Sequence, residues 1–239
     1  MLKNDDEQWL RTAYPGLVRD PKGVAGNLEF KATYDPKNNR FLILAEGVAD
    51  SASGVALSGQ FKIRIEERND KTFSSLPALF VEDVEASDKR HFGQKDKSAC
   101  LCSPFVEDEF LHPEFQFRAF LEQLVIPFLY AQVFCSLKEH WPWSEYAHGA
   151  TGLLEAYSQI VGQAKTEHCL RLLRQDKAWE RIKSSLLQRP YIKGHTPCFC
   201  PKMDHIRRCH PTALRGAQRL QEDIKTLVIP MQLTEGGIS

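Results

Sequence analysis

Two separate groups of cysteine and histidine residues in this 239-residue chain have spacings that suit chemistry. The first lies within Arg90–Cys102, where His91 precedes Cys100 by nine residues and Cys102 follows just beyond Leu101. The residues between the histidine and the first cysteine are polar and turn-prone, whereas apolar sequence flanks them. A thiol in such a place lies at the edge of a packed body, where it can react. Cys100 is therefore a candidate nucleophile, and the alternative is a small buried residue at the end of a strand.

Two features of the neighbouring sequence bear on this candidate. Arg90, Lys95 and Lys97 lie close to Cys100 in sequence and would favour its thiolate, although such a charge run is more often a solvated loop. Cys102 is a second thiol, but a Leu-Cys pair at the end of a strand is explained more simply by packing. We therefore prefer Cys100 over Cys102 as the nucleophile.

The second group combines a Cys-x-Cys pair, eight intervening residues and a Cys-His pair. Thiolate and imidazole are the ligands that zinc prefers, and four of them close a tetrahedral site with no open position. The expected cofactor is therefore a structural Zn²⁺ ion. His195 and His205 are alternative nitrogen donors, and a chance cluster of reduced cysteines is the alternative to a metal site. The expected ligands are Cys198, Cys200, Cys209 and His210.

Composition limits the classes of partner and the compartment. The formal net charge is zero, so no global electrostatic attraction to nucleic acid or to an anionic membrane is expected. Arg207, Arg208, Arg215 and Arg219 make the C-terminal region locally basic, but the neutral total favours a protein partner and makes nucleic acid unlikely. The polar start of the sequence and the absence of a long uninterrupted apolar run predict neither a secretory signal nor a membrane span. Seven cysteines, partly paired as Cys-x-Cys, fit a reducing cytoplasm.

The first half of the chain has the pattern of a short helix followed by a sheet. A helix is expected over Asn4–Tyr14, with acidic residues in its first turn. Four strands separated by short turns then predict an antiparallel meander. The expected strands are residues 28–34, 41–44, 60–66 and 76–84.

After Cys102 the apolar spacing becomes that of helices. Residues 115–140 predict a helix with a broad apolar face that bends or restarts at Pro127. Further helices are expected over residues 151–160, 167–187 and 212–228, with a loop rich in cysteine and histidine over residues 192–208. Because the strands come first and the helices later, the expected fold class is α+β.

The order of these elements around Cys100 resembles the layout of ubiquitin-conjugating (UBC) domains. Two motifs are similar to those of bacterial members of that superfamily, and the resemblance covers about residues 5 to 160. One is Arg90-His91 followed by Ser98-Ala99-Cys100-Leu101. The other is Trp-Pro-Trp-Ser-Glu-Tyr-Ala-His-Gly over residues 141–149, where Ser144 takes the place of a glycine.

The resemblance implies that Cys100 accepts a ubiquitin-like protein as a thioester. In the superfamily the histidine of this loop mainly braces the loop, and we prefer that role for His91 over general base. Phe92-Gly93 stands where eukaryotic members have Pro-Asn, so the asparagine thought to steady the oxyanion is missing. His148 belongs to the second motif and either lies near Cys100 or caps the next helix.

The second group of ligands resembles the SEC-C motif, Cys-x-Cys-x8-Cys-(Cys or His), and matches it at all four positions. Pro201-Lys202-Met203 replaces the usual Gly-Ser-Gly after the second cysteine. The resemblance implies a small zinc knuckle over about residues 190–211 that staples a region without an evident core. SEC-C knuckles are associated with protein or nucleic-acid partners, and the neutral net charge favours protein.

These observations lead to one functional hypothesis and two rivals. The chain is expected to comprise a UBC-like domain over residues 1–162 and a helical extension with the knuckle over residues 163–239. It would act as a bacterial ubiquitin-conjugating enzyme that works with a ubiquitin-like protein, a separate activating enzyme and a protein target. By resemblance, antiviral defence is a plausible setting. The rivals are a catalytically silent UBC-fold scaffold and a zinc-dependent interaction module.

Overall fold

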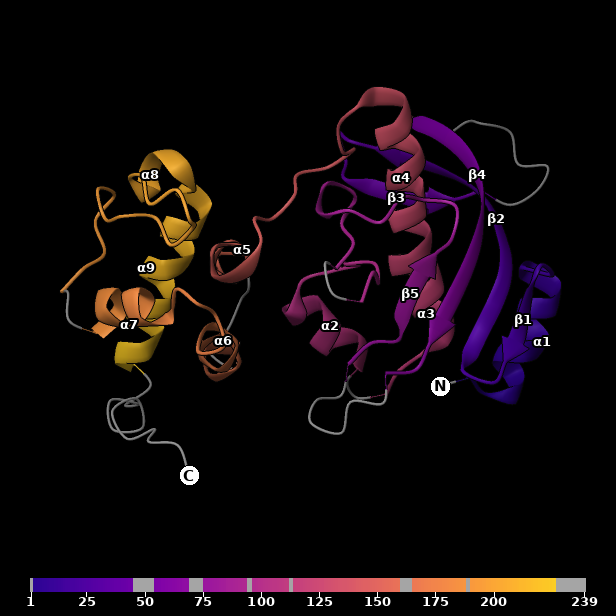
Figure 1. The fold of residues 1–239 in the computed structure, drawn as a ribbon, viewed down its shortest axis with the longest axis horizontal. Coiled ribbons are helices and arrows are strands. Elements are labelled where there is room, and N and C mark those ends of the chain that lie inside the picture. The colour runs from indigo at the N-terminus through magenta and orange to yellow at the C-terminus, as the bar shows by residue number, and fades with distance from the viewer. Residues whose placement is uncertain are drawn as a thin grey trace. The chain divides into compact units, whose positions relative to one another are not determined.

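The computed structural model describes residues 2–44, 54–68, 75–93, 96–111, 114–159, 165–187 and 190–226, and these form two compact units. The first unit is Met1–Ser144 and the second is Glu145–Ser239 (Figure 1). We expected the boundary after residue 162, but it lies earlier. The reason is that helix α5 (Gly149–Tyr157) packs against the C-terminal helix α9 (Pro211–Thr226) and so belongs to the second unit.

The first unit is built on an antiparallel sheet of five strands within the described residues. Its order is β1-β2-β4-β5, with β3 also paired to β2. β4 pairs with β2 from Gly23↔Glu66 to Tyr34↔Val55, so β1 and β3 both take the other edge of β2. The strands are β1 (Leu17–Asp20), β2 (Gly23–Asp35), β3 (Arg40–Ile43), β4 (Val55–Glu66) and β5 (Ala78–Val81).

This topology corrects the expected four-strand meander in two respects. β1 was not expected, and β3 does not lie between the two strands that precede and follow it in the chain. The four expected strands are present, but β2 and β4 each begin five residues earlier than predicted and β5 is shorter, and the α+β class is confirmed. In β4, for example, Phe61, Ile63 and Ile65 are buried while Gln60 and Lys62 are exposed.

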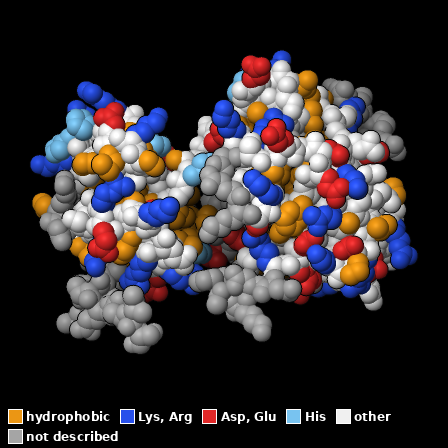
Figure 2. Space-filling view, in the orientation of Figure 1, with side chains coloured by type: hydrophobic (Ala, Val, Ile, Leu, Met, Phe, Trp, Pro, Cys, Tyr) orange, Lys and Arg blue, Asp and Glu red, His pale blue; other side chains and the backbone are white. Residues whose placement is uncertain are grey.

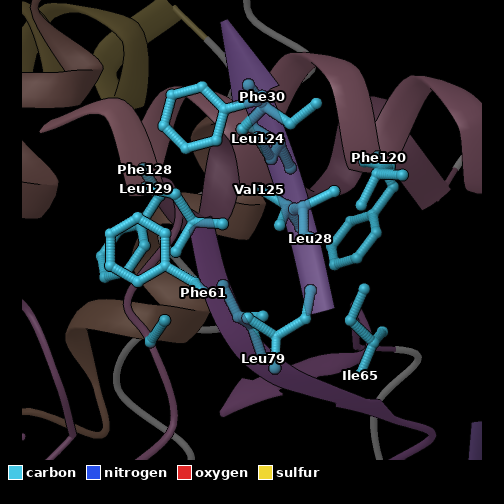
Figure 3. Close-up of a cluster of buried hydrophobic side chains, with 14 of the residues drawn as sticks. Leu28, Phe30, Phe61, Ile65, Leu79, Phe120, Leu124, Val125, Phe128 and Leu129 are labelled. Carbon is cyan, nitrogen blue, oxygen red and sulfur yellow. The ribbon is translucent and has the colours of Figure 1, made fainter. Parts of the chain in front are cut away.

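One face of the sheet packs against a long helix. Figure 3 shows Leu28, Phe61 and Leu79 from three neighbouring strands meeting Val125 and Leu129 of that helix. These side chains are buried, and each contributes roughly 1.5–3 kcal/mol of transfer free energy to folding. The core of the first unit therefore lies between β2, β4 and β5 on one side and this helix on the other.

The long helix changes pitch next to its proline. It runs through α3 (Phe117–Phe120), a π-helical turn η2 (Leu121–Val125) and α4 (Ile126–Lys138), and Pro127 occupies the start of α4. Proline donates no N–H and its ring crowds the preceding turn, which a wider π-turn relieves. The expected restart at Pro127 is thus confirmed. Phe117–Lys138 is also apolar and long enough to span a membrane, but 61% of its most apolar stretch is buried in the protein, as in a core helix.

Three short elements complete the first unit. Helix α1 (Asn4–Ala13) confirms the expected N-terminal helix, and its first turn is acidic. The 3₁₀ turn η1 (Asp88–Arg90) leads into the His91 loop, and α2 (Pro104–Leu111) begins shortly after Cys102. The helix α2 was not expected from the sequence.

The second unit is helical. Besides α5 and α9 it contains α6 (Thr166–Leu173), α7 (Trp179–Leu187) and the short α8 (Ile206–Cys209). The single helix expected over residues 167–187 is therefore wrong. Asp176 separates its two halves, because its carboxylate accepts the N–H of Ala178 at 2.7 Å and that of Ala150 at 2.7 Å. Helices α5 and α9 meet at Gly216, where the carbonyl oxygen of Leu154 fills the space that a Cβ would need.

Candidate thiol site and candidate metal centre

Cys100 lies on a loop that folds back on itself as a small hairpin. Its N–H donates to the carbonyl of His91 at 2.7 Å, and the N–H of Gly93 donates to the carbonyl of Ser98 at 2.8 Å. The N–H of Ala99 donates to Leu79 in β5 at 2.8 Å, which joins the hairpin to the edge of the sheet. Cys100 therefore directly follows Ala99, whose backbone is fixed by its hydrogen bond to the sheet.

The other strand of this loop is fastened to helix α4. The guanidinium of Arg90 donates to the carbonyl of Gln132 at 3.2 Å and to Ser136 Oγ at 2.8 Å, and the Gln132 amide donates back to the carbonyl of Arg90 at 2.9 Å. The Arg90 side chain therefore joins the loop to α4 through hydrogen bonds. Lys97 is exposed, and Lys95 lies outside the described residues.

His91 contacts its surroundings through its backbone and the edge of its ring. Its φ is 57°, in the left-handed region, and its carbonyl receives the hydrogen bond from Cys100. Its ring packs edge-on against Trp141 with centroids 4.6 Å apart. The next residue, Phe92, is buried and packs on Phe128 of α4 at 5.5 Å. These contacts suit the bracing role that we preferred for His91.

The two thiols of the loop differ in exposure. Cys100 is exposed and Cys102 is half-buried. Desolvation of the sulfur, followed by the negative charge of Glu107 in α2, raises the pKa of Cys100. The same causes, with Cys100 itself as a third, raise the pKa of Cys102 to about 12. Cys100 is thus the more accessible thiol, and its environment favours the neutral form over the thiolate.

Glu107 gives a direct test of this electrostatic environment. Because its charge raises the pKa of Cys100, Glu107→Gln should increase the thiolate fraction at pH 8 and speed alkylation of Cys100 by iodoacetamide severalfold. The glutamine can still accept the hydrogen bond that Leu76 N–H donates to this side chain at 2.8 Å, so the fold should persist.

The measurement is the alkylation rate of the Cys100 peptide by mass spectrometry as pH is raised. Glu109→Gln, on the exposed side of the same helix, is the matched control and should leave the profile unchanged. Equal profiles for the two variants would show that Glu107 does not act on this thiol.

The Trp141–Gly149 motif divides between the two units. Trp141 packs on His91, and Trp143 packs on Tyr34 and Tyr130 in the first unit. In the second unit the N–H of Ala147 donates to Glu155 at 2.7 Å, and His148 is the N-cap residue of α5. Of the two expected roles for His148, the position before α5 is the one that the fold supports.

The expected metal ligands come together in the second unit. One ligand atom from each of four residues lies within 4.8 Å of the others, and the four residues are Cys198, Cys200, Cys209 and His210. The Sγ of Cys198 is 3.2 Å from Nδ1 of His210, and the sulfurs of Cys200 and Cys209 are 3.5 Å apart. Neighbouring sulfurs around a tetrahedral zinc ion with bonds of about 2.3 Å lie about 3.8 Å apart. The donor set and its spacing therefore fit Zn²⁺, whereas His195 and His205 are exposed and do not belong to the cluster.

Local backbone bonds hold these ligands in place. The N–H of Cys198 donates to the carbonyl of Asp204 at 2.7 Å, and the N–H of Ile206 donates to Thr196 at 2.9 Å, which closes a hairpin that leads into α8. Burial raises the pKa of Cys198 to about 12. Burial acts the same way on Cys200, but hydrogen bonds from Cys209 and from the backbone of Lys202 outweigh it and lower the pKa of Cys200.

Pro201-Lys202-Met203, which replace the Gly-Ser-Gly of the SEC-C motif, affect the backbone of this hairpin. Met203 adopts a φ of 52°, in the left-handed region that glycine enters without cost, and its side chain is 54% exposed. The turn Cys200–Met203 is closed by a hydrogen bond from Met203 N–H to Cys200 O at 3.2 Å. The replacement thus keeps the turn at the cost of some backbone strain and leaves the ligand set unchanged.

Sequence reasoning missed two residues of the thiol site. Gln132 is 42 residues from Arg90 in sequence, so no local sequence signal could have found it. Glu107 lies only seven residues after Cys100, and its negative charge was a local signal that sequence reasoning did not weigh. No family model, no curated protein and no solved structure matches this chain.

Proposed function

We propose that this protein is a ubiquitin-conjugating enzyme of UBC-like fold that carries a ubiquitin-like protein as a thioester on Cys100. The observation that carries the proposal is an exposed thiol on a loop tied both to β5 and to α4. A carrier cysteine must be reachable by two successive protein partners, and it must not move while they exchange the acyl group. The motifs around Cys100 and Trp141 support the family by resemblance, and a defence role rests on the same resemblance. The cytoplasmic setting rests on the seven cysteines, which suit a reducing compartment.

The proposed step is a thiol–thioester exchange. The sulfur of Cys100 loses its proton and attacks the carbonyl carbon of the thioester that joins the C-terminal glycine of the ubiquitin-like protein to the activating enzyme. A new S–C bond forms as the old one breaks, and the departing thiolate of the activating enzyme takes up a proton. An amine of the target protein then attacks the same carbonyl carbon, and Cys100 leaves.

The raised pKa of Cys100 bears on both halves of this reaction. A thiol of raised pKa is a poorer leaving group, so an acyl group on Cys100 is lost more slowly to adventitious nucleophiles. The same property lowers the thiolate fraction for the first step at neutral pH. The environment thus supports a carrier cysteine that keeps its acyl group until the acceptor amine arrives.

For the second unit we propose a structural zinc knuckle, held by Cys198, Cys200, Cys209 and His210. The closed set of four converging ligands supports a stapling role and leaves no position for a reacting water. This cluster is also the observation that favours the rival hypothesis of a zinc-dependent interaction module.

The decisive experiment is a charging assay on a non-reducing gel. The protein is incubated with ATP, a cognate activating enzyme and its ubiquitin-like protein. We expect a thiol-sensitive adduct that survives Cys102→Ser and is lost, or replaced by a thiol-resistant ester, in Cys100→Ser. If the activating enzyme forms its own thioester with the ubiquitin-like protein but no adduct appears on this chain, the carrier role is overturned. That result would favour the catalytically silent UBC-fold scaffold.

A further inference from the structure

The zero net charge of the chain conceals two units of opposite charge. Residues 1–144 contain 17 Lys and Arg against 22 Asp and Glu, whereas residues 145–239 contain 14 Lys and Arg against nine Asp and Glu. The formal charges are thus −5 and +5. The zero charge of the whole chain made a nucleic-acid partner unlikely, but the second unit by itself is basic enough to attract one.

The excess positive charge of the second unit includes a cluster around the metal centre. Four exposed cations lie on the knuckle hairpin and on α8, where Asp204 is the only acidic residue between the first and the last of them. We call them the basic knuckle face: Lys193, Lys202, Arg207 and Arg208. In Figure 2, Lys, Arg and His side chains gather over the part of this unit that carries α8.

Among the described residues, the four cations of this face have no acidic partners, unlike several cations of the first unit. In the first unit Lys3, Arg19, Lys62, Arg68 and Arg118 each form an ion pair with a carboxylate. In the part of the chain that the structure describes, none of the four side chains of the basic knuckle face forms one. Their charge is therefore available to a ligand.

The metal centre does not account for this charge. A Zn²⁺ ion with three thiolates and a neutral imidazole carries a net charge of −1, so a filled site would still leave the second unit at about +4. One or two nearby cations suffice to balance the centre electrostatically. Four cations held by a hairpin and a helix exceed that need.

We propose that the basic knuckle face binds the phosphodiester backbone of a single-stranded nucleic acid. Two of its four members are arginines, whose planar guanidinium suits phosphate oxygens. Protein–protein interfaces are depleted of lysine and need an apolar centre, whereas nucleic-acid interfaces are polar and strongly positive. The only aromatic neighbour with a largely exposed side chain in this described segment is Tyr191, 49% exposed, two residues before Lys193, and it offers a surface on which a base can stack.

The test is fluorescence anisotropy of the full-length, zinc-loaded chain with a labelled 20-nucleotide uridine RNA, the matching deoxythymidine strand and a 20-base-pair duplex. Four phosphate contacts predict a salt slope of about −2.8 for single strands, so the association constant should fall about 50-fold between 50 and 200 mM salt. The double variant Lys202→Gln, Arg208→Gln should halve that slope and leave only a fall of about sevenfold.

The matched control is Arg174→Ala with Lys177→Ala. It removes the same two charges from the same unit, beyond the end of α6, which lies at the opposite end of the unit from α8 (Figure 1). Its binding and salt slope should equal those of the wild-type chain. Zinc content and thermal unfolding of both variants establish that each is folded.

Three results would overturn the proposal. The first is the absence of salt-dependent binding to both single strands at 50 mM salt, or tighter binding to the duplex than to either single strand. The second is an equal loss of binding in the two double variants, which would indicate attraction to net charge rather than to this face. The third is equal or tighter binding of polyglutamate of matched length, which would assign the face to an acidic protein. Preference for RNA, for DNA or for neither strand type would each support the proposal, since the phosphodiester is common to both.

Discussion

Cys198→Ser should release the zinc ion and destabilise the second unit by at least about 3 kcal/mol. Cys198 is fully buried among the other ligands, and its backbone N–H closes the hairpin that carries them. Serine oxygen is a poor zinc ligand, and three remaining ligands would hold the ion weakly. For a unit of this size, 3 kcal/mol lowers Tm by roughly 15 °C.

The measurements are metal content by mass spectrometry and thermal unfolding by circular dichroism. Wild-type protein should contain about one zinc ion per chain, and a chelator should lower its Tm toward that of the variant while leaving the variant itself unchanged. Cys135→Ser, which alters a half-buried cysteine on α4 outside the cluster, serves as the control and should keep both metal and Tm. A Cys198→Ser protein with full zinc content would contradict the four-ligand site.

Gly216→Ala should destabilise the second unit by about 3 kcal/mol, at the upper end of the cost of overpacking. A Cβ at this position would lie 1.7 Å from the carbonyl oxygen of Leu154, which is backbone and cannot rotate away. Helices α5 and α9 would have to separate, and the packing of Leu154, Ala217 and Leu220 would loosen. The intrinsic helix propensity of alanine, which exceeds that of glycine by about 1 kcal/mol, offsets only part of this cost.

Hydrogen exchange followed by mass spectrometry can assign the effect to the second unit. Peptides from α5 and α9 should lose protection in Gly216→Ala, whereas peptides from β2 and β4 should keep theirs. Arg215→Ala changes the exposed neighbour on the same helix and should shift stability by no more than about 0.5 kcal/mol. Unchanged protection of α5 in Gly216→Ala would mean that the two helices do not pack as closely as described.

The elements that periodicity could predict are those whose burial follows a simple period. β4 alternates over its expected part, residues 60–66, and α9 repeats its apolar residues every three or four positions close to its expected bounds. β4 begins five residues before the expected strand. β1 is four residues long and leaves Val18 61% exposed, so its pattern carries no such signal. In the region of Asp176 the periodicity favoured one continuous helix, but two backbone N–H groups donate hydrogen bonds to the Asp176 carboxylate and stabilise a turn instead.

The two candidate sites also differ in how much of each could be predicted from the sequence. The metal ligands are close in sequence on one hairpin, so their spacing alone predicted which residues converge. The surroundings of Cys100 come from contacts between different elements, such as the Arg90 loop with Gln132 of α4 and Cys100 with Glu107 of α2. Sequence reasoning therefore placed Cys100 on a loop and preferred a solvated role for the cations near it, but it did not predict the helix α2 whose Glu107 acts on the thiol.

The opposite charges of the two units also affect how the protein behaves as a solute. A molecule whose net charge is zero lacks the mutual repulsion that keeps proteins apart, and here the acidic unit of one copy attracts the basic unit of another. This attraction is screened within about 8 Å at physiological ionic strength but reaches about 30 Å at 0.01 M salt. The ionic strength of a buffer, more than its pH near neutrality, therefore governs whether concentrated samples stay dispersed.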